Sequence, residues 1–231
     1  MQFDLLAVLG RGIQRVGGQW QPGADFEMWG VVEGYRGHLA EPLPIDDDSA
    51  NCFIGGCELN LRAGAEIFQQ FGAKVVVCAY GDRAPYLRRV NGPTESEIDT
   101  GVFLNFSSFS VLYTPTVEIW TKEKSAPAFN TYQELTNIFS LAKARGMFKV
   151  AICAITVHLP RVRVFAEKIL STAELGQFVV SYFSAEQVLV EADAIVYAPR
   201  VLAIYASKAF ARTAASEAKG VQRFLTGKYV M

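Results

Sequence analysis

Short apolar runs alternate with amphipathic segments along most of this chain. The runs are almost uninterrupted, as expected for strands buried on both faces of a parallel sheet, and cover residues 5–9, 74–79, 116–120, 148–155 and 177–182. Apolar residues at helical spacing, with polar caps and glycine stops, predict helices over residues 58–71, 94–106 and 131–145. This order predicts an α/β fold: a Rossmann-like three-layer sandwich with a mostly parallel sheet of about five strands.

Two stretches do not follow this alternation. Residues 12–49 are rich in glycine, proline and aromatic residues without a sustained period, and a loop of this length is usually functional, so we expect a lid-like insertion. Residues 200–231 are alanine-rich and predict a helical C-terminal extension. A chain of 231 residues fits one large domain, so we expect residues 1–231 to form a single Rossmann-like domain.

Composition and charge exclude several classes of protein. Hydrophobic residues make up 51% of the chain and charged residues 19%, which indicates a globular and not a disordered protein. The 22 basic and 23 acidic residues give a net charge of -1, so the chain as a whole does not attract nucleic acid. Any site for an anion therefore has to be local.

Cysteine and histidine usage indicates a reduced compartment without a metal site. The four cysteines occur singly, without a C-x-x-C pair, and the chain has two histidines, so no metal is expected. Cys78 and Cys153 fall inside predicted strands, where a free thiol acts as a small hydrophobic group, and this favours a cytoplasmic location. No apolar run reaches membrane length and none follows a basic stretch, so we expect neither a signal peptide nor membrane insertion. The tract Asp46–Asp48 does not follow a strand, which favours an exposed acidic run before a helix over a metal site.

The first predicted strand ends in Gly10, Arg11 and Gly12. Two glycines around an arginine let the backbone turn tightly and approach a ligand, as at the start of a dinucleotide-binding fingerprint. The third glycine of that fingerprint is missing, so a plain tight turn is an equal alternative.

A second group of polar residues, Thr156, His158 and Arg161, directly follows the apolar run at residues 148–155. Pro160 suits the first turn of a helix, so these residues are expected where a strand passes into a helix N-terminus. Ligands of open α/β sheets bind at this edge, and imidazole is useful there for proton transfer or anion binding. The alternative is a histidine that only forms a hydrogen bond to the backbone.

Glu97 has two interpretations. Thr94 and Glu97 have the T-x-x-E spacing of a capping box, in which the glutamate only closes a helix N-terminus. Because the carboxyl ends of parallel strands share one edge, Glu97 is also expected to meet His158 there and share a proton with it. The neighbouring loop carries arginines that either clamp an anion or form exposed surface: Arg83, Arg88 and Arg89.

Four motifs in this order resemble the SanA/ElyC/YdcF family, also called domain of unknown function 218. They are LGRG at residues 9–12, Ser96–Glu97, Asn130–Thr131–Tyr132 and TVHLPR at residues 156–161. The similarity covers about residues 3–185, and the last two motifs are its most specific parts. The chain departs from the family at Gln133–Glu134–Leu135, where members usually have tyrosine, glutamate and asparagine after NT, and in its long 12–49 segment.

The resemblance implies a Rossmann-like fold in a bacterial family. One type of member binds S-adenosylmethionine, and others are tied to envelope polysaccharides through a membrane anchor, which this chain lacks in our interpretation. From the residues themselves we expect catalytic roles for His158 and Glu97. The expected ligand-binding residues are Gly10, Arg11, Gly12, Ser96, Asn130, Thr131, Thr156 and Arg161.

Two functions follow as expectations. The first is a small-molecule enzyme, a transferase or hydrolase, that acts on a nucleoside- or phosphate-bearing compound with His158 as acid or base and S-adenosylmethionine as the candidate cofactor. The alternative is a ligand-binding module without turnover, or a factor in envelope polysaccharide metabolism. A small molecule is the expected partner in either case, and the sequence leaves a homo-oligomer open.

Overall fold

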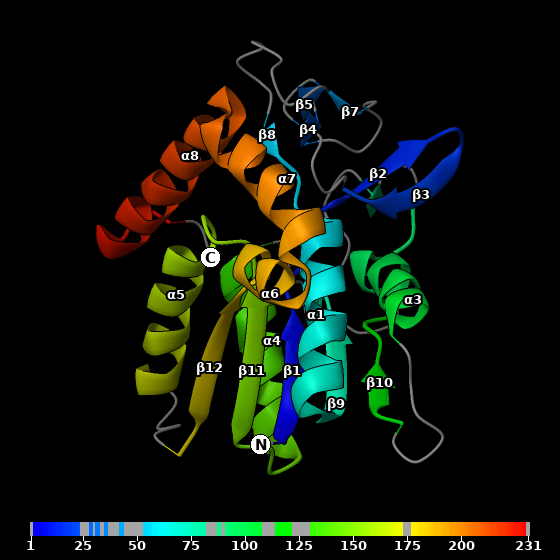
Figure 1. The fold of residues 1–231 in the computed structure, drawn as a ribbon. Coiled ribbons are helices and arrows are strands. Elements are labelled where there is room, and N and C mark those ends of the chain that lie inside the picture. Colours follow the sequence, from blue (N-terminus) through cyan, green and yellow to red (C-terminus); the bar gives the residue numbers. More distant parts are fainter. Residues whose placement is uncertain are drawn as a thin grey trace.

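A computed structural model describes residues 2–23, 28–29, 31–32, 35–36, 42–43, 53–81, 87–88, 91–107, 114–121, 130–172 and 177–229. Its centre is a five-stranded sheet in which every neighbouring pair of strands is parallel (Figure 1). In spatial order the strands are β10 (Thr116–Glu118), β9 (Ala73–Cys78), β1 (Phe3–Val8), β11 (Lys149–Ala154) and β12 (Val179–Ser184). The predicted α/β, Rossmann-like fold is therefore confirmed.

The strand order defines where a ligand would bind. Taken along the chain, the strands of this sheet lie in the order third, second, first, fourth and fifth, so the winding direction reverses between β1 and β11. In doubly wound sheets the crevice outside the carboxyl ends of the strands at this switch point is the usual ligand site. Here it is flanked by Gly10–Gly12, after β1, and by Thr156–Arg161, after β11.

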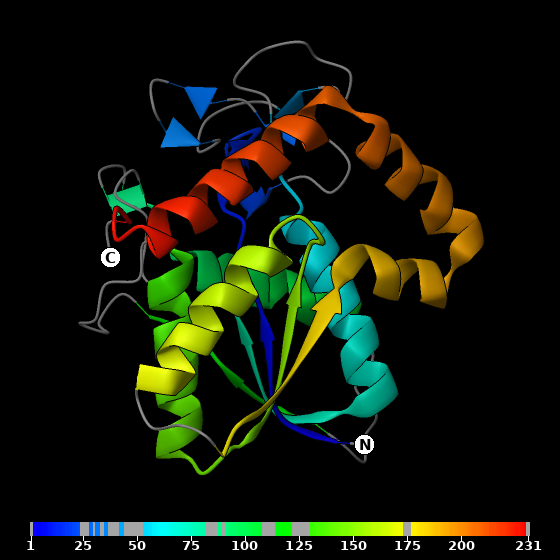
Figure 2. The same cartoon turned by 90° about the vertical axis from the view of Figure 1, so that its left-hand side faces the viewer.

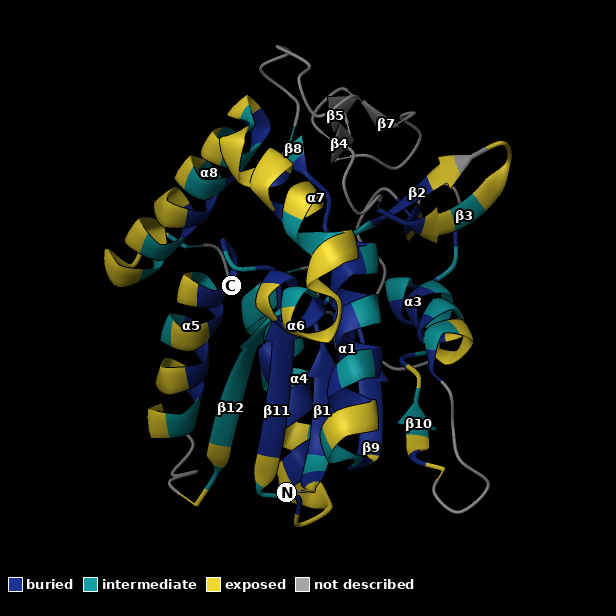
Figure 3. Cartoon of the chain, in the orientation of Figure 1, coloured by how far each residue is buried: buried dark blue, intermediate teal, exposed yellow. Residues whose placement is uncertain are grey.

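Helices cover both faces of the sheet (Figure 2). One face packs against α1 (Cys57–Phe71), α3 (Glu95–Phe106) and α6 (Ala185–Ala192). The other face packs against α4 (Thr131–Ala144) and α5 (Leu159–Thr172). Successive residues of a strand point to opposite faces, so the apolar residues of β1 are divided between the two cores. Figure 3 shows the central strands as the most deeply buried part of the chain.

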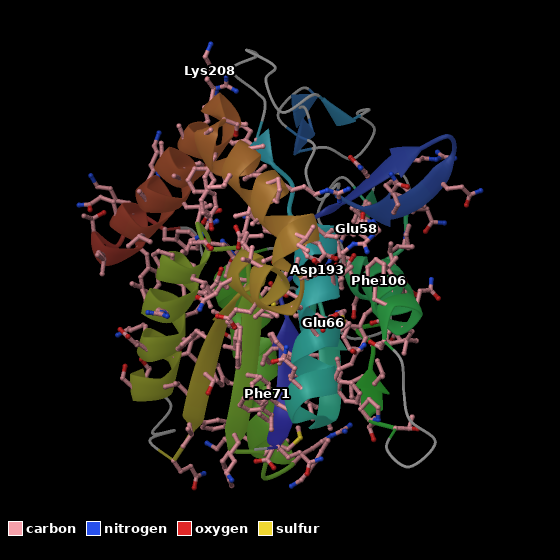
Figure 4. The ribbon with its side chains drawn as sticks, viewed as in Figure 1. Glu58, Glu66, Phe71, Phe106, Asp193 and Lys208 are labelled. Atoms are coloured by element: carbon pink, nitrogen blue, oxygen red, sulfur yellow. The ribbon has the colours of Figure 1, made fainter. Side chains whose placement is uncertain are left out.

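The C-terminal extension forms two helices, α7 (Ala194–Ala206) and α8 (Lys208–Leu225), as predicted. Figure 4 shows Asp193 and Lys208 at the two ends of α7, and Lys208 lies at the corner where the chain turns into α8. Figures 1 and 2 place α8 above the carboxyl ends of the strands. It contacts α5 and the short strand β8 (Phe53–Ile54), so the extension covers part of the edge where ligands would bind.

The insertion contains regular structure that the sequence pattern did not predict. An antiparallel hairpin joins β2 (Ile13–Val16) to β3 (Gln19–Pro22) through Gly17 and Gly18. Both glycines have positive φ, 54° and 85°, as a tight two-residue hairpin turn requires. Four-residue strands are too short to show periodicity, which explains the error.

Shorter pairs follow the hairpin. β4 (Met28–Trp29) pairs with β7 (Pro42–Leu43) and β8, and β5 (Val31–Val32) pairs with β6 (Tyr35–Arg36). Asp46–Asp48 and the arginines at positions 83 and 89 lie outside the described residues, so the acidic tract and the arginine clamp stay predictions.

Two further expectations concern thiols and membrane spans. Cys57, Cys78 and Cys153 are free and buried, as predicted for reduced core cysteines, while Cys52 lies outside the described residues. Among the helices that the structure describes, none combines the length and the apolar character needed to cross a bilayer.

Candidate functional site

The turn after β1 is the centre of the candidate site. A Cβ atom added to Gly10 would lie 2.7 Å from the Cβ of Ala79 and 3.0 Å from the Oε2 of Glu95. Gly12 has a φ of 95°, a conformation that L-residues with side chains rarely adopt. The fold therefore requires glycine at both positions. The turn also brings the end of β9 and the start of α3 close to its backbone.

Arg11 points from this turn toward α8 and is almost fully buried. Its Nη1 forms an ion pair of 2.8 Å with Oε1 of Glu217. Its remaining donors bind backbone carbonyls, with Nε 3.2 Å from Gly55 O and Nη2 3.3 Å from Ile54 O. Arg11 thus connects the first turn of the sheet to β8 and to α8.

His158 directly precedes α5 and is also buried, with 2% of its surface exposed. Its Nδ1 lies 2.9 Å from Oε2 of Glu217, and its Nε2 lies 3.3 Å from Oγ1 of Thr131. An ionised carboxylate only accepts hydrogen bonds, so Nδ1 carries the proton and Nε2 accepts from the Thr131 hydroxyl. Both ring nitrogens of His158 are therefore engaged.

Arg161 completes the group around the same carboxylate. Its Nη2 lies 2.5 Å from Oε2 of Glu217. Gly220 of α8 allows this approach, because a Cβ at that position would lie 2.8 Å from Nη1 of Arg161. We call Arg11, His158 and Arg161 the basic cluster; all three bind the carboxylate of Glu217.

The basic cluster controls the protonation of Glu217. Burial alone would raise the pKa of this carboxyl, but His158, Arg11 and Arg161 together bring the pKa well below its usual range. Burial lowers the pKa of His158, and the positive charges of Arg11 and Arg161 add to this effect against the attraction of Glu217. The site therefore holds an ionised glutamate and a neutral histidine.

Sequence reasoning missed Glu217. The sequence pattern shows it only as part of an alanine-rich helix, yet α8 buries a stripe at helical spacing that includes polar residues: Ala209, Thr213, Glu217 and Gly220. A threonine and a glutamate on the buried stripe of an otherwise basic helix were the signal that could have identified it.

Carboxylates gather on the other side of the turn after β1. The backbone N–H of Gly10 donates to Oε1 of Glu134 over 3.2 Å, and a backbone hydrogen bond from Gly12 reaches Glu95. Burial raises the pKa of Glu95 to about 7, and the bond from Gly12 and the charge of Arg11 only partly oppose this. Burial raises the pKa of Glu134 to about 8, and the charge of Glu95 adds to the rise. Both side chains are half-buried, so they keep access to solvent.

Asp99 lies beneath them and is almost completely buried. Its Oδ2 accepts from Sγ of Cys57 over 3.1 Å, whereas its Oδ1 has no hydrogen-bond partner among the described residues. Burial and the neighbouring charge of Glu95 raise the pKa of Asp99 well above its usual value. We call Glu95, Asp99 and Glu134 the acid cluster. Within the described part of the chain, no three His, Cys, Asp or Glu side chains are placed to hold a metal ion.

Comparison with known proteins gives no relatives. No protein-family model, no curated protein and no solved structure matches the chain. The similarity to the SanA/ElyC/YdcF family therefore rests on the four motifs alone. Of the residues in those motifs, the switch point brings together Gly10, Arg11, Thr131, His158 and Arg161.

Glu97 is not the partner of His158, which was the expectation from topology. Its Oε2 accepts from the backbone N–H of Thr94 over 2.6 Å, and its own N–H donates to Oγ1 of Thr94 over 3.1 Å. This is the capping box of α3, the alternative interpretation. The carboxylate that His158 binds is Glu217, so a proton shared between His158 and Glu97 is excluded in this arrangement.

Ser96 and Asn130 hold the scaffold around the site. The Oγ of Ser96 is buried and accepts from the backbone N–H of Trp120 over 3.0 Å, which ties α3 to the end of β10. Asn130 caps α4 by accepting from the N–H of Gln133 over 3.1 Å. The next residue, Thr131, is the one that reaches His158.

Thr156 belongs to a separate polar group between β11 and β12. Its Oγ1 lies 2.6 Å from Oγ of Ser184, 3.0 Å from Oε2 of Glu186 and 3.0 Å from the hydroxyl of Tyr205. Its N–H also donates to Glu186 over 2.7 Å. These contacts fix the end of β11 against α6 and direct the Thr156 side chain away from the basic cluster.

Proposed function

We propose that the protein is an enzyme that binds a nucleoside- or phosphate-bearing small molecule at the switch point and moves a proton with Glu95 and Glu134. The observation that carries this proposal is the pair of half-buried carboxyl groups beside the turn at Gly10, with pKa values raised to about 7 and about 8. Groups that titrate near neutral pH in a ligand crevice are suited to general acid and base catalysis.

The two carboxyls divide the roles. At neutral pH Glu134 is mostly protonated and serves as the acid, while a substantial fraction of Glu95 is ionised and serves as the base. Such a pair supports transfer or hydrolysis, in which one group takes the proton of a nucleophile and the other protonates a leaving group. We assign proton transfer to these residues and not to His158, because both nitrogens of His158 are engaged.

The acceptor groups of the site suit a nucleoside. Ribose hydroxyls and amino groups donate hydrogen bonds, and carboxylates after the first strands of Rossmann-like sheets accept them. S-adenosylmethionine, the ligand implied by the family resemblance, fits in this respect, since its hydroxyls and positive charges complement the ionised fraction of Glu95. When bound, it would supply a methyl group for transfer.

Native mass spectrometry of the purified protein tests this function. We expect a nucleoside- or phosphate-containing compound to remain bound, and to be converted over hours at neutral pH by the wild type but not by the variant Glu95→Gln/Glu134→Gln. The matched control is Glu191→Gln, an exposed glutamate on α6. Conversion by the double variant at the wild-type rate would exclude the acid cluster from catalysis.

One observation favours a second candidate, a binding module without turnover. The histidine expected to react is buried and held by Thr131 and Glu217, as a structural residue would be. In that case the same compound remains bound to the wild type and its mass does not change with time.

A further inference from the structure

The basic cluster carries more positive charge than the single carboxylate within it neutralises. Arg11 and Arg161 are always protonated, whereas Glu217 contributes one negative charge. Glu95 is the other carboxylate that interacts with Arg11, and its raised pKa leaves it partly neutral. In addition, Nε of Arg161 is buried and has no hydrogen-bond partner among the described residues. An excess of positive charge on one buried and one partly buried arginine, with an unused donor, favours a bound anion.

We propose that the basic cluster is the binding site for a phosphate group of the ligand, and that Glu217 occupies this site until the ligand displaces it. The inference rests on the proposed function, because it assumes a ligand that carries a phosphate. In the empty protein the carboxylate of Glu217 occupies the position that the phosphate group would take. Its Oε1 binds Arg11, and its Oε2 binds both His158 and Arg161.

The number of oxygen atoms favours phosphate over carboxylate. Both oxygens of Glu217 are used, and Nε of Arg161 is still unsatisfied. A phosphate group offers three or more acceptor oxygens, so it satisfies the same donors and the remaining one. A guanidinium is also better suited than an ammonium to such multidentate contacts.

Displacement of Glu217 requires that the middle of α8 move, and the packing of this part of the helix permits it. Its fully buried residues are small or polar: Ala209, Thr213, Glu217 and Gly220. The apolar contacts of α8 lie toward its two ends, where Phe210 packs against Tyr205 and Phe224 against Phe165, so polar contacts contribute much of what holds its middle in place. One of these is the hydrogen bond of 2.9 Å from Ile54 N to Oγ1 of Thr213. Elements with few buried apolar contacts are the ones that open at low free energy.

Displacement also changes what His158 does. With Glu217 withdrawn, Nδ1 of His158 faces the phosphate and donates to it, and Thr131 continues to hold Nε2. α8 therefore acts as a latch: it closes the anion site of the empty protein and opens when phosphate takes the place of Glu217. Binding of the ligand and the position of α8 are then coupled.

The experiment measures the melting temperature of Glu217→Ala in inorganic phosphate and in chloride at equal ionic strength. We expect phosphate to raise it by about 3–6 °C, since the vacated site binds the ion, and to raise the wild type and the matched control Glu191→Ala far less. The variant Glu217→Ala/Arg161→Gln should lose the response. Equal shifts in all four proteins would overturn the proposal.

A second measurement covers the case in which Glu217→Ala does not fold. Trypsin cleaves after Lys219 and Arg223 of α8, and in the wild type inorganic phosphate should increase the cleavage rate several-fold over chloride. An unchanged rate would overturn the latch. Both measurements use inorganic phosphate and no turnover, so their failure is separate from failure of the acid cluster in catalysis.

Discussion

The acid cluster and the basic cluster flank the same turn after β1, but their charges are balanced in opposite ways. In the acid cluster, carboxyls face one another, and the pKa of Glu134 is raised to about 8. In the basic cluster, three cationic or polar donors surround one carboxylate, and the pKa of Glu217 lies well below its usual range. Burial raises the pKa of both glutamates, so the neighbouring charges decide the sign of the net shift.

This difference gives the two clusters opposite effects on stability as pH changes. The folded-state pKa values of Glu95 and Glu134 lie above the ordinary value of 4.5, so their stabilising contribution is complete below that pH and is lost as pH rises through about 7 and 8. Those of His158 and Glu217 are lowered, so their contribution is complete above 6.5 and 4.5 and is lost as pH falls. We therefore expect maximum stability in weakly acidic to neutral solution.

The largest effect is expected from Glu217→Ala. It leaves the buried guanidinium of Arg11 and the partly buried guanidinium of Arg161 without their carboxylate, which should lower the free energy of unfolding by about 3–5 kcal/mol. Urea denaturation at pH 7 measures this change. Glu191→Ala is the control and should stay within about 0.5 kcal/mol of the wild type. A loss below about 1 kcal/mol for Glu217→Ala would show that the basic cluster does not depend on its carboxylate.

Removing a charge from the acid cluster should stabilise the protein, and the change in the free energy of unfolding should be smaller than for Glu217→Ala. Glu134→Gln removes a carboxyl whose ionised form is disfavoured by burial and by the charge of Glu95, so it should raise the free energy of unfolding at pH 9 by about 1–3 kcal/mol, discounted because the group is half-buried. At about pH 3.5 the carboxyl is protonated in most molecules of both states, and the variant should match the wild type. Urea denaturation at about pH 3.5, 7 and 9 gives the comparison. A gain that does not depend on pH would contradict the raised pKa.

The fold could be predicted from the sequence because each parallel strand that is buried on both faces appears as a short, uninterrupted apolar run. The apolar run at residues 148–155 became β11 (Lys149–Ala154), and the helix stop at Gly72 was also placed correctly. The same topology explains why Gly10, Thr131 and His158 were expected at one edge of the sheet. The hairpin at Ile13–Pro22 was missed, because strands of four residues carry too little periodicity.

The partners within the site could not be predicted from local patterns. Glu217 lies 59 residues from His158 and reaches it only because α8 folds back over the strand ends. Glu134 was noticed only as a departure from the family pattern, since nothing in its neighbourhood along the chain shows that Gly10 will donate to it. Both contacts depend on how helices dock on the sheet, which the spacing of apolar residues leaves open.

The smallest effect is expected from Glu97→Ala. This variant distinguishes a Glu97 that only caps α3 from a Glu97 that pairs with His158. Loss of the capping box should lower the free energy of unfolding by about 0.5–1 kcal/mol, as measured by urea denaturation. Histidine NMR then reports whether Glu97 is coupled to His158. The chain has two histidines, so a His38→Asn variant assigns the signals.

We expect Glu97→Ala to leave the titration of the His158 imidazole unchanged, since its ring nitrogens contact Thr131 and Glu217. Glu217→Gln should move it, because the carboxylate that attracts the imidazolium is gone while the two arginines remain. A shift in Glu97→Ala as large as in Glu217→Gln would mean that the carboxylate–imidazole pair expected from topology forms in solution. The capping-box assignment of Glu97 would then be wrong.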